Sequence, residues 1–107
     1  DESRLIFVAA DENDRVLGYI FCIIIDHSAD SARCPNTELY IDDLCVDEKF
    51  RREGIGDALF QKALSTAQEL GCHNLTLNVW EGNDSALRFY EEHGMKIQKR
   101  ELEIVLD

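Results

Sequence analysis

A short stretch with two glycines, Arg51 to Gly56 (RREGIG), directly precedes a helical pattern. Glycines let the backbone turn so that several N–H groups point into one concavity, and a helix that begins there adds the positive end of its dipole. The arginines add positive charge at the same point, although the chain as a whole is acidic. The stretch therefore predicts a binding site for a phosphate or pyrophosphate group.

Two better-known phosphate-binding loops do not match this stretch. A dinucleotide-binding fingerprint needs a small residue three positions after Gly56, where Leu59 stands, and no Gly-Lys-Ser/Thr of a P-loop is present. Taken without its context, a glycine pair in a turn before a helix, with no ligand, is an equally good interpretation.

Periodic hydrophobicity predicts the elements that position this stretch. Apolar runs at 5–10 and 16–25 surround an Asx-rich turn and predict an antiparallel hairpin, and 38–46 predicts another strand. The segment 26–37 contains the only proline, has no periodicity and predicts a loop. The first half of the chain is therefore expected to be mostly β.

The second half predicts two helices. Apolar residues recur at helical spacing over 55–70, with Gly71 at the C-cap, and a second, shorter helix is expected at 85–93. Between them, 74–80 alternates as a half-buried strand, and 95–106 is a last extended segment. A strand, a helix and a strand in succession imply a parallel pair. The fold class is therefore α/β (α+β), with a mixed sheet.

Length and charge limit the class of protein. The 107 residues make one domain, 1–107, which is too short for two lobes with a cleft between them. The net charge of -11 disfavours nucleic acid as a partner and favours a cationic ligand, although solubility alone would also explain it. No apolar stretch is long enough to cross a membrane. The four cysteines have no metal-ligand spacing, so we expect no metal and free thiols in a reducing, cytoplasmic environment.

Two motifs and the order of the elements resemble the GNAT superfamily of N-acetyltransferases. The acetyl-CoA motif of that family, Q/R-x-x-G-x-G/A after a strand ending in L-x-V, is matched by Leu44 to Val46 and then Arg51 to Gly56. Its second motif is matched by LNVWEGNDSALRFYEEHG at 77–94. The resemblance covers about residues 3–106 and implies a mostly antiparallel twisted sheet with a splayed central parallel pair and two main helices.

The resemblance also implies where acetyl-CoA would bind. The pantetheine would pair with the backbone of Leu44 and Val46, in the gap between the splayed strands. Asn83 matches an asparagine that often contacts the cofactor, although a helix N-cap is an equally good role for it. The expected pyrophosphate site is made of Arg51 and the N–H groups of Arg52, Gly54, Ile55, Gly56 and Asp57.

Catalysis in this family is direct transfer of the acetyl group to an amine through a tetrahedral intermediate. The N–H of Leu44 matches the donor to the oxyanion, and Tyr90 matches the general acid. Tyr90 also lies on the apolar face of its predicted helix, so a packing role is the alternative.

The general base is not carried over from the resemblance. Tyr40 and Asn78 stand where other groups of the family place a glutamate, whereas Asp42 and Asp43 match the acidic pair of diamine acetyltransferases. Adjacent strand residues point to opposite faces, so both reach one acceptor only across a bulge. If they are buried together, one carboxyl would have a raised pKa and could accept a proton through a water. Glu38 is the reserve candidate, and one solvated aspartate beside one that caps a bulge is the alternative.

The resemblance therefore implies an enzyme that acetylates a primary amine, and the acidic charge with Asp42 and Asp43 favours a cationic small molecule as acceptor. Two alternatives are an acetyltransferase acting on protein N-termini or lysines, and an acyl-CoA-binding module without turnover. Family members usually begin with a strand and one or two helices before the hairpin, whereas Leu5 already matches the second strand. We expect an upstream segment or a second subunit, as in a homodimer, to complete the acceptor side.

Overall fold

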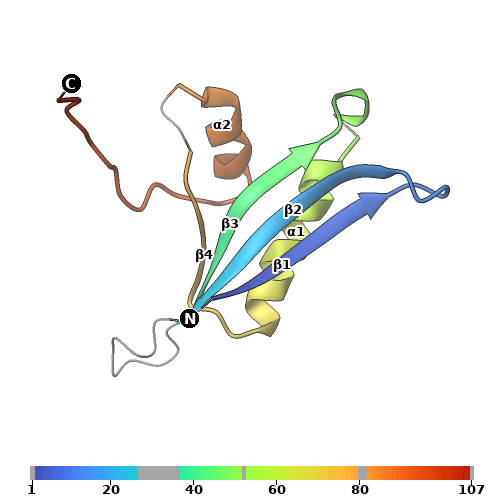
Figure 1. Ribbon diagram of the computed structural model, residues 1–107, viewed down its shortest axis with the longest axis horizontal. Coiled ribbons are helices and arrows are strands. Elements are labelled where there is room, and N and C mark those ends of the chain that lie inside the picture. Colours follow the sequence, from blue (N-terminus) through green and yellow to red (C-terminus); the bar gives the residue numbers. More distant parts are fainter. Residues whose placement is uncertain (1, 27–36, 52, 80–81, 107) are drawn as a thin grey trace.

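The computed structural model describes residues 2–26, 37–51, 53–79 and 82–106, and it contains one mixed sheet and two main helices (Figure 1). The sheet order is β1-β2-β3-β4, antiparallel except for the parallel pair β3 and β4. The predicted fold class is confirmed, except that the parallel pair lies at one edge of the described sheet and not at its centre, because β4 has no further neighbour there. In chain order the elements are β1 (Glu2–Ala10), β2 (Val16–Asp26), β3 (Thr37–Val46), the 3-10 turn η2 (Glu48–Phe50), α1 (Ile55–Glu69), β4 (Asn74–Leu77) and α2 (Asp84–Glu92).

The predicted hairpin is formed by β1 and β2, and β1 begins three residues earlier than expected. In its turn, one carboxylate oxygen of Asp11 accepts the N–H groups of Asn13 and Arg15, at 2.9 and 3.0 Å. Asp14 has a φ of 63°, in the left-handed region that aspartate tolerates better than most residues. Of the predicted loop, residues 27–36 lie outside the described part of the chain.

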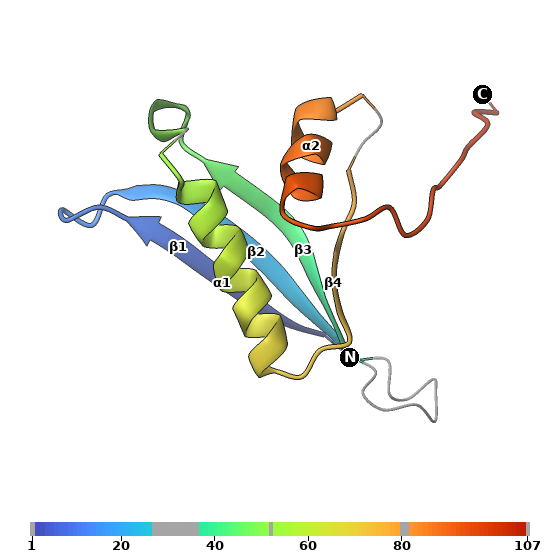
Figure 2. The ribbon, with the colours of Figure 1, turned by 180° about the vertical axis from the view of Figure 1, so that it is seen from behind.

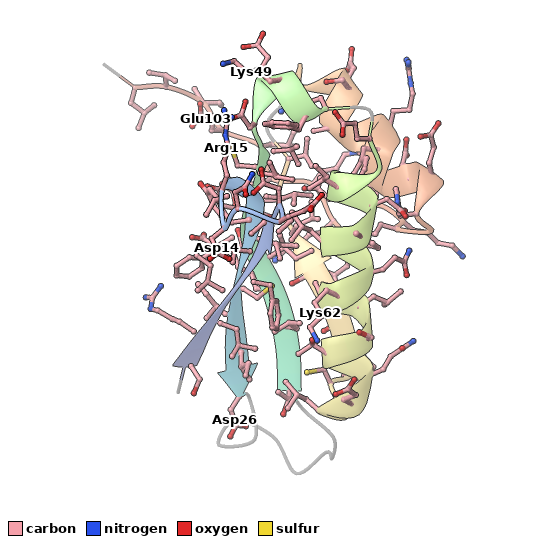
Figure 3. The ribbon with its side chains drawn as sticks, turned by 90° about the vertical axis from the view of Figure 1, so that its right-hand side faces the viewer. Asp14, Arg15, Asp26, Lys49, Lys62 and Glu103 are labelled. Carbon is pink, nitrogen blue, oxygen red and sulfur yellow. The ribbon has the colours of Figure 1, made fainter. Side chains whose placement is uncertain are left out.

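Helix α1 covers one face of the sheet (Figure 2). Lys62 of α1 reaches back toward the sheet, where its Nζ lies 5.3 Å from the centre of the Phe7 ring (Figure 3). On the opposite face, where no described helix packs, Ile6 and Val8 are 58% and 57% exposed. The core between α1 and the sheet consists of Ile20, Cys22, Leu39, Ile41, Leu59, Phe60, Ala63 and Ala67.

Two further predicted boundaries differ from the structure. Leu70, and not Gly71, is the C-cap of α1, and Gly71 follows it with a φ of 72°. Strand β4 ends at Leu77 instead of residue 80, because its pairing with β3 stops there. Past that point the alternating sequence has no neighbouring strand with which to form a ladder.

Helix α2 matches its predicted range to within one residue at each end. Asn83 is its N-cap and accepts the N–H of Ala86 at 3.4 Å, so the predicted capping role is confirmed. The segment 95–106 forms no strand and extends away from the sheet in both views (Figures 1 and 2). Its apolar side chains Leu102 and Leu106 are 91% and 92% exposed.

Within its described ranges, the chain has no helix that is both long and apolar enough to span a membrane. Cys22, Cys45 and Cys72 carry free thiols, whereas Cys34 lies outside the described residues. Burial raises the pKa of the Cys22 thiol to about 11, so this cysteine is a core side chain and not a nucleophile.

Candidate active site

Strand β3 continues past the end of its parallel partner β4. Glu38–Ile41 pairs with Asn74–Leu77, and the described residues show no pairing beyond these. A cavity of about 190 Å³ lies beyond the paired residues, and it is lined by the second half of β3, the end of β4 and the residues after it, and α2. It brings together five of the predicted site residues. Its lining is formed by Ile41, Asp42, Asp43, Leu44, Leu77, Asn78, Val79, Asn83, Ala86 and Tyr90.

A β-bulge turns both aspartates toward this cavity. In the pairing of β2 with β3, Phe21 lies opposite Asp43 and Cys22 lies opposite Ile41, so Asp42 is the extra residue. The bulge that the sequence argument required is therefore present. Both carboxylates are exposed, however, which corrects the expectation of a buried pair.

The hydroxyl of Tyr19 holds one of these carboxylates. It donates a hydrogen bond to Oδ2 of Asp43 at 2.7 Å, and this bond, with the charge of Asp43, raises the pKa of Tyr19. Tyr19 was not predicted from the sequence as a site residue. Its position on β2 could be linked to Asp43 only once the bulged register was known, because the bulge decides which residues share a face.

Tyr90 lines the cavity from α2. The centre of its ring lies 5.2 Å from the ring centre of Phe89 and 6.1 Å from that of Phe60. Burial raises the pKa of its hydroxyl, and the negative charge of Asp43 raises it further. The hydroxyl therefore keeps its proton near neutral pH, and it is a hydrogen-bond donor. Both proposed roles of Tyr90, packing and proton donation, are compatible with this position.

Two pairs of polar side chains link β3 to β4 and to the residue directly after β4. Nδ2 of Asn78 donates to the hydroxyl of Tyr40 at 3.2 Å, and the hydroxyl of Thr76 donates to a carboxylate oxygen of Glu38. Because Leu39 and Ile41 face α1, alternation places both pairs on the opposite face of the sheet. Glu38, the reserve candidate for the base, is thus bonded to its neighbouring strand and is not among the residues that line the cavity.

The turn before α1 is built by residues that follow β3 directly. Asp47 anchors it, because its N–H donates to the carbonyl of Leu17 at 2.8 Å and its side chain accepts the N–H of Lys49 at 3.0 Å. Nε of Arg51 donates to the carbonyl of Val46 at 3.3 Å. Arg52 lies outside the described residues.

The two glycines of the turn have different roles. Gly54 is the N-cap of α1 with a φ of 82°, which favours glycine, whereas Gly56 lies in the first turn of the helix. A Cβ at Gly56 would meet the Phe89 ring at 3.6 Å, an ordinary contact. This corrects the expectation that both glycines shape the turn. Among the described residues no side chain caps α1, so its first N–H groups are available to an anion.

A histidine that the sequence analysis did not single out joins the two helices. Nε2 of His93 lies 2.6 Å from Oδ1 of Asp57, in the first turn of α1. The described residues contain no cluster of His, Cys, Asp or Glu side chains that could hold a metal ion.

Comparison with known proteins adds a family match. The model of the "Acetyltransferase (GNAT) family" matches residues 1–95. The Bacillus subtilis protein named "Putative phosphinothricin acetyltransferase YwnH" is 32% identical over 93 residues, which cover 87% of this chain and 54% of that protein. Human N-alpha-acetyltransferase 30 is 43% identical over 61 residues, covering 57% of this chain and 17% of that protein. The chain therefore spans about half the length of YwnH, and less of the human protein.

Solved structures show the same fold. The tetramutant of the BH1408 protein from Bacillus halodurans superimposes with a TM-score of 0.83 at 30% sequence identity. The alignment covers 96% of this chain and 66% of that structure.

Proposed function

Since this chain belongs to the GNAT acetyltransferase family, we propose that it transfers the acetyl group of acetyl-CoA directly to a primary amine of a cationic small molecule. One observation supports a cationic small molecule as the acceptor. Asp42 and Asp43 are both exposed, and both line the cavity between β3 and β4. Two carboxylates at one cavity, in a chain with a net charge of -11, attract an ammonium group and position it by charge.

The described residues fit acetyl-CoA, which supplies an activated acetyl thioester. The uncapped N–H groups of the first turn of α1 suit its pyrophosphate, with Arg51 beside them. From Asp42 on, β3 has no partner strand on the side of β4 among the described residues, so the backbone of Leu44 and Val46 is free to pair with an extended pantetheine. We assign Asn83 a contact to the cofactor in addition to its cap.

Three groups of the chain are assigned to oxyanion stabilisation, proton donation and proton acceptance. We assign the N–H of Leu44 to the negative charge that develops on the acetyl oxygen. Tyr90 is assigned as the general acid that protonates the departing CoA thiolate when the C–S bond breaks, because burial raises the pKa of its hydroxyl and keeps it protonated. Asp43, held by Tyr19, or Asp42 beside it takes the proton of the incoming ammonium, directly or through a water.

A thiol-release assay tests this function on a panel of polyamines, aminoglycosides, amino acids and short peptides. We expect release of CoA with the polyamines or aminoglycosides above the rate without acceptor. If every cationic small amine is inactive while another acceptor is acetylated, the acceptor class is wrong and the family activity stands.

Acetylation of a protein N-terminus or lysine is the second candidate. The 43% identity to human N-alpha-acetyltransferase 30 over 57% of this chain favours it, since that relative is named for an α-amino acceptor. Peptides that outcompete the small amines in the same panel would decide for it. The third candidate, an acyl-CoA-binding module, requires CoA binding by calorimetry without transfer to any acceptor.

Two further expectations belong to this proposal. The exposed Ile6 and Val8 on the uncovered sheet face support a homodimer in which a second copy completes the acceptor side. A monomeric mass in solution would contradict it. The free thiols of Cys22, Cys45 and Cys72 support a reducing, cytoplasmic location.

A further inference from the structure

We propose that His93 is a positioning residue whose imidazolium form ties α2, the helix that carries Tyr90, to the first turn of α1. The proposal rests on the proposed function, because that turn is assigned to the pyrophosphate of acetyl-CoA. Three sets of contacts lead to it: two hydrogen bonds, two aromatic rings and the charges that face the imidazole.

The hydrogen bonds of His93 require two protons. Nδ1 lies 2.7 Å from the carbonyl oxygen of Phe89, and Nε2 lies 2.6 Å from Oδ1 of Asp57. Both partners are acceptors, whereas a neutral imidazole carries only one N–H. A neutral ring would therefore leave a lone pair facing one acceptor. Only the imidazolium donates to both at once.

The position of the ring favours a cation. The backbone N–H of His93 donates to the carbonyl of Tyr90 and leaves the carbonyl of Phe89 to the imidazole. The Phe89 carbonyl lies at the C-terminal end of α2, which is the negative end of the helix dipole. The ring centre lies 4.3 Å from that of Phe89 and 4.9 Å from that of Phe60. Aromatic faces attract a positive charge at such distances.

The charged groups around His93 are mostly negative. Asp57 faces it from α1 and Glu92 acts from its own helix, while Lys96 of the following segment lines a second cavity together with His93. The hydrogen bond to the carbonyl of Phe89 raises the pKa of His93 most. Burial opposes this effect, and the bond to Asp57 and the charges of Asp57 and Glu92 add to it.

The tie matters because α2 is weakly anchored. None of the residues of α2 is fully buried. Among the described residues, the bond from His93 to Asp57 is the one side-chain hydrogen bond between α1 and the end of α2. Asp57 would also repel a pyrophosphate at the start of α1, and the imidazolium neutralises that charge. The tie should therefore strengthen CoA binding and hold Tyr90 at the cavity.

The sign of the pH effect follows from the raised pKa. Below the ordinary histidine pKa of 6.5 the stabilisation is fully present, and it is lost as the pH rises through the higher pKa of the folded protein. Stability and CoA affinity should both fall over that window. CoA has its own titrating phosphate, so variants must be compared at each pH.

The experiment compares the wild type with His93→Gln, Asp57→Asn and the matched control His73→Gln, which changes an exposed histidine outside this junction. Urea unfolding and calorimetric titration with CoA are measured at steps between pH 5.5 and 8.5. We expect His93→Gln to bind CoA about five-fold more weakly than the wild type at low pH, with the difference shrinking as the pH rises. Asp57→Asn should reduce the pH dependence of unfolding without abolishing it, because the bond to the Phe89 carbonyl remains, and His73→Gln should match the wild type.

Histidine ring nitrogen NMR on the wild type keeps the test independent of folding of the variants. We expect both ring nitrogens of His93 to be protonated at pH 6. A neutral ring at pH 6, or parallel pH profiles of unfolding for the wild type and His93→Gln, would overturn the proposal. Absence of CoA binding at every pH would instead contradict the proposed function, and the unfolding and NMR data would still decide on the tie.

Discussion

The two halves of β3 have opposite surroundings. In Glu38–Ile41 the strand is paired on both edges, and Leu39 and Ile41 are buried against α1. In the half from Asp42 to Val46, one edge is paired with β2, the other borders the cavity, and both aspartates are exposed. The second half begins at Asp42, the single extra residue of the bulge.

This difference shows how one strand supplies both stability and a site. A paired backbone has its N–H and C=O groups satisfied by neighbouring strands. It can therefore be buried, and its apolar side chains pack in the core. A free edge keeps these groups available to an extended ligand, as in β-strand addition. The divergence of β4 therefore creates the proposed pantetheine site without any special residue type in β3.

The largest expected effect separates the halves by stability. Leu39→Ala removes a side chain that is 0% exposed and should lower the free energy of unfolding by about 2–5 kcal/mol, through lost burial and the cavity left behind. Leu44→Ala, the matched change in the unpaired half, should cost less than half as much, because Leu44 is only partly buried. Urea unfolding measures both. Equal losses would mean that the second half also belongs to the core.

The next effect concerns chemistry at the free edge. Tyr90→Phe removes the hydroxyl assigned as general acid and should lower the transfer rate by about 10-fold or more. Calorimetric CoA affinity should stay within about two-fold, because the ring that packs on Phe60 and Phe89 is retained. An unchanged transfer rate would remove Tyr90 from the mechanism and leave it a packing role.

A smaller effect tests the turn that follows the unpaired half. Gly54→Ala places a Cβ on a residue with a φ of 82° and should destabilise the protein by about 1–2 kcal/mol. Gly56→Ala is the matched control, since its Cβ would make only an ordinary contact with Phe89 inside α1. Thermal unfolding of the two variants compares them. If Gly56→Ala is the more damaging variant, the left-handed turn does not limit stability.

The smallest effect tests local against overall charge. Asp43→Asn should raise the KM for a polyamine about two- to five-fold, because the lost charge lies at the cavity. Asp14→Asn removes the same charge in the hairpin turn (Figure 3) and should leave KM nearly unchanged. Steady-state kinetics at fixed ionic strength measures both, since salt screens the distant charge. Equal changes would assign the acceptor preference to net charge alone.

Local patterns were enough to predict most elements. The apolar runs of β1 and β2, the helical spacing in α1 and the cap at Asn83 are contained in neighbouring residues, and each is found in the structure within a few residues. The end of β4 is a boundary that these patterns predicted wrongly. Its alternation continues past Leu77, but a strand exists only where another strand pairs with it, and this depends on the path of β3.

The sequence by itself determined the family, through the spacing of Leu44 and Val46 to the Arg51–Gly56 stretch and the second motif at 77–94. The tertiary structure decided what surrounds these residues. It decided that Asp42 is the bulged residue, that Tyr19 holds Asp43, and that His93 reaches Asp57 across 36 positions of sequence. The physical reason is that motifs are local, whereas register, strand divergence and helix contacts depend on how distant segments pack together.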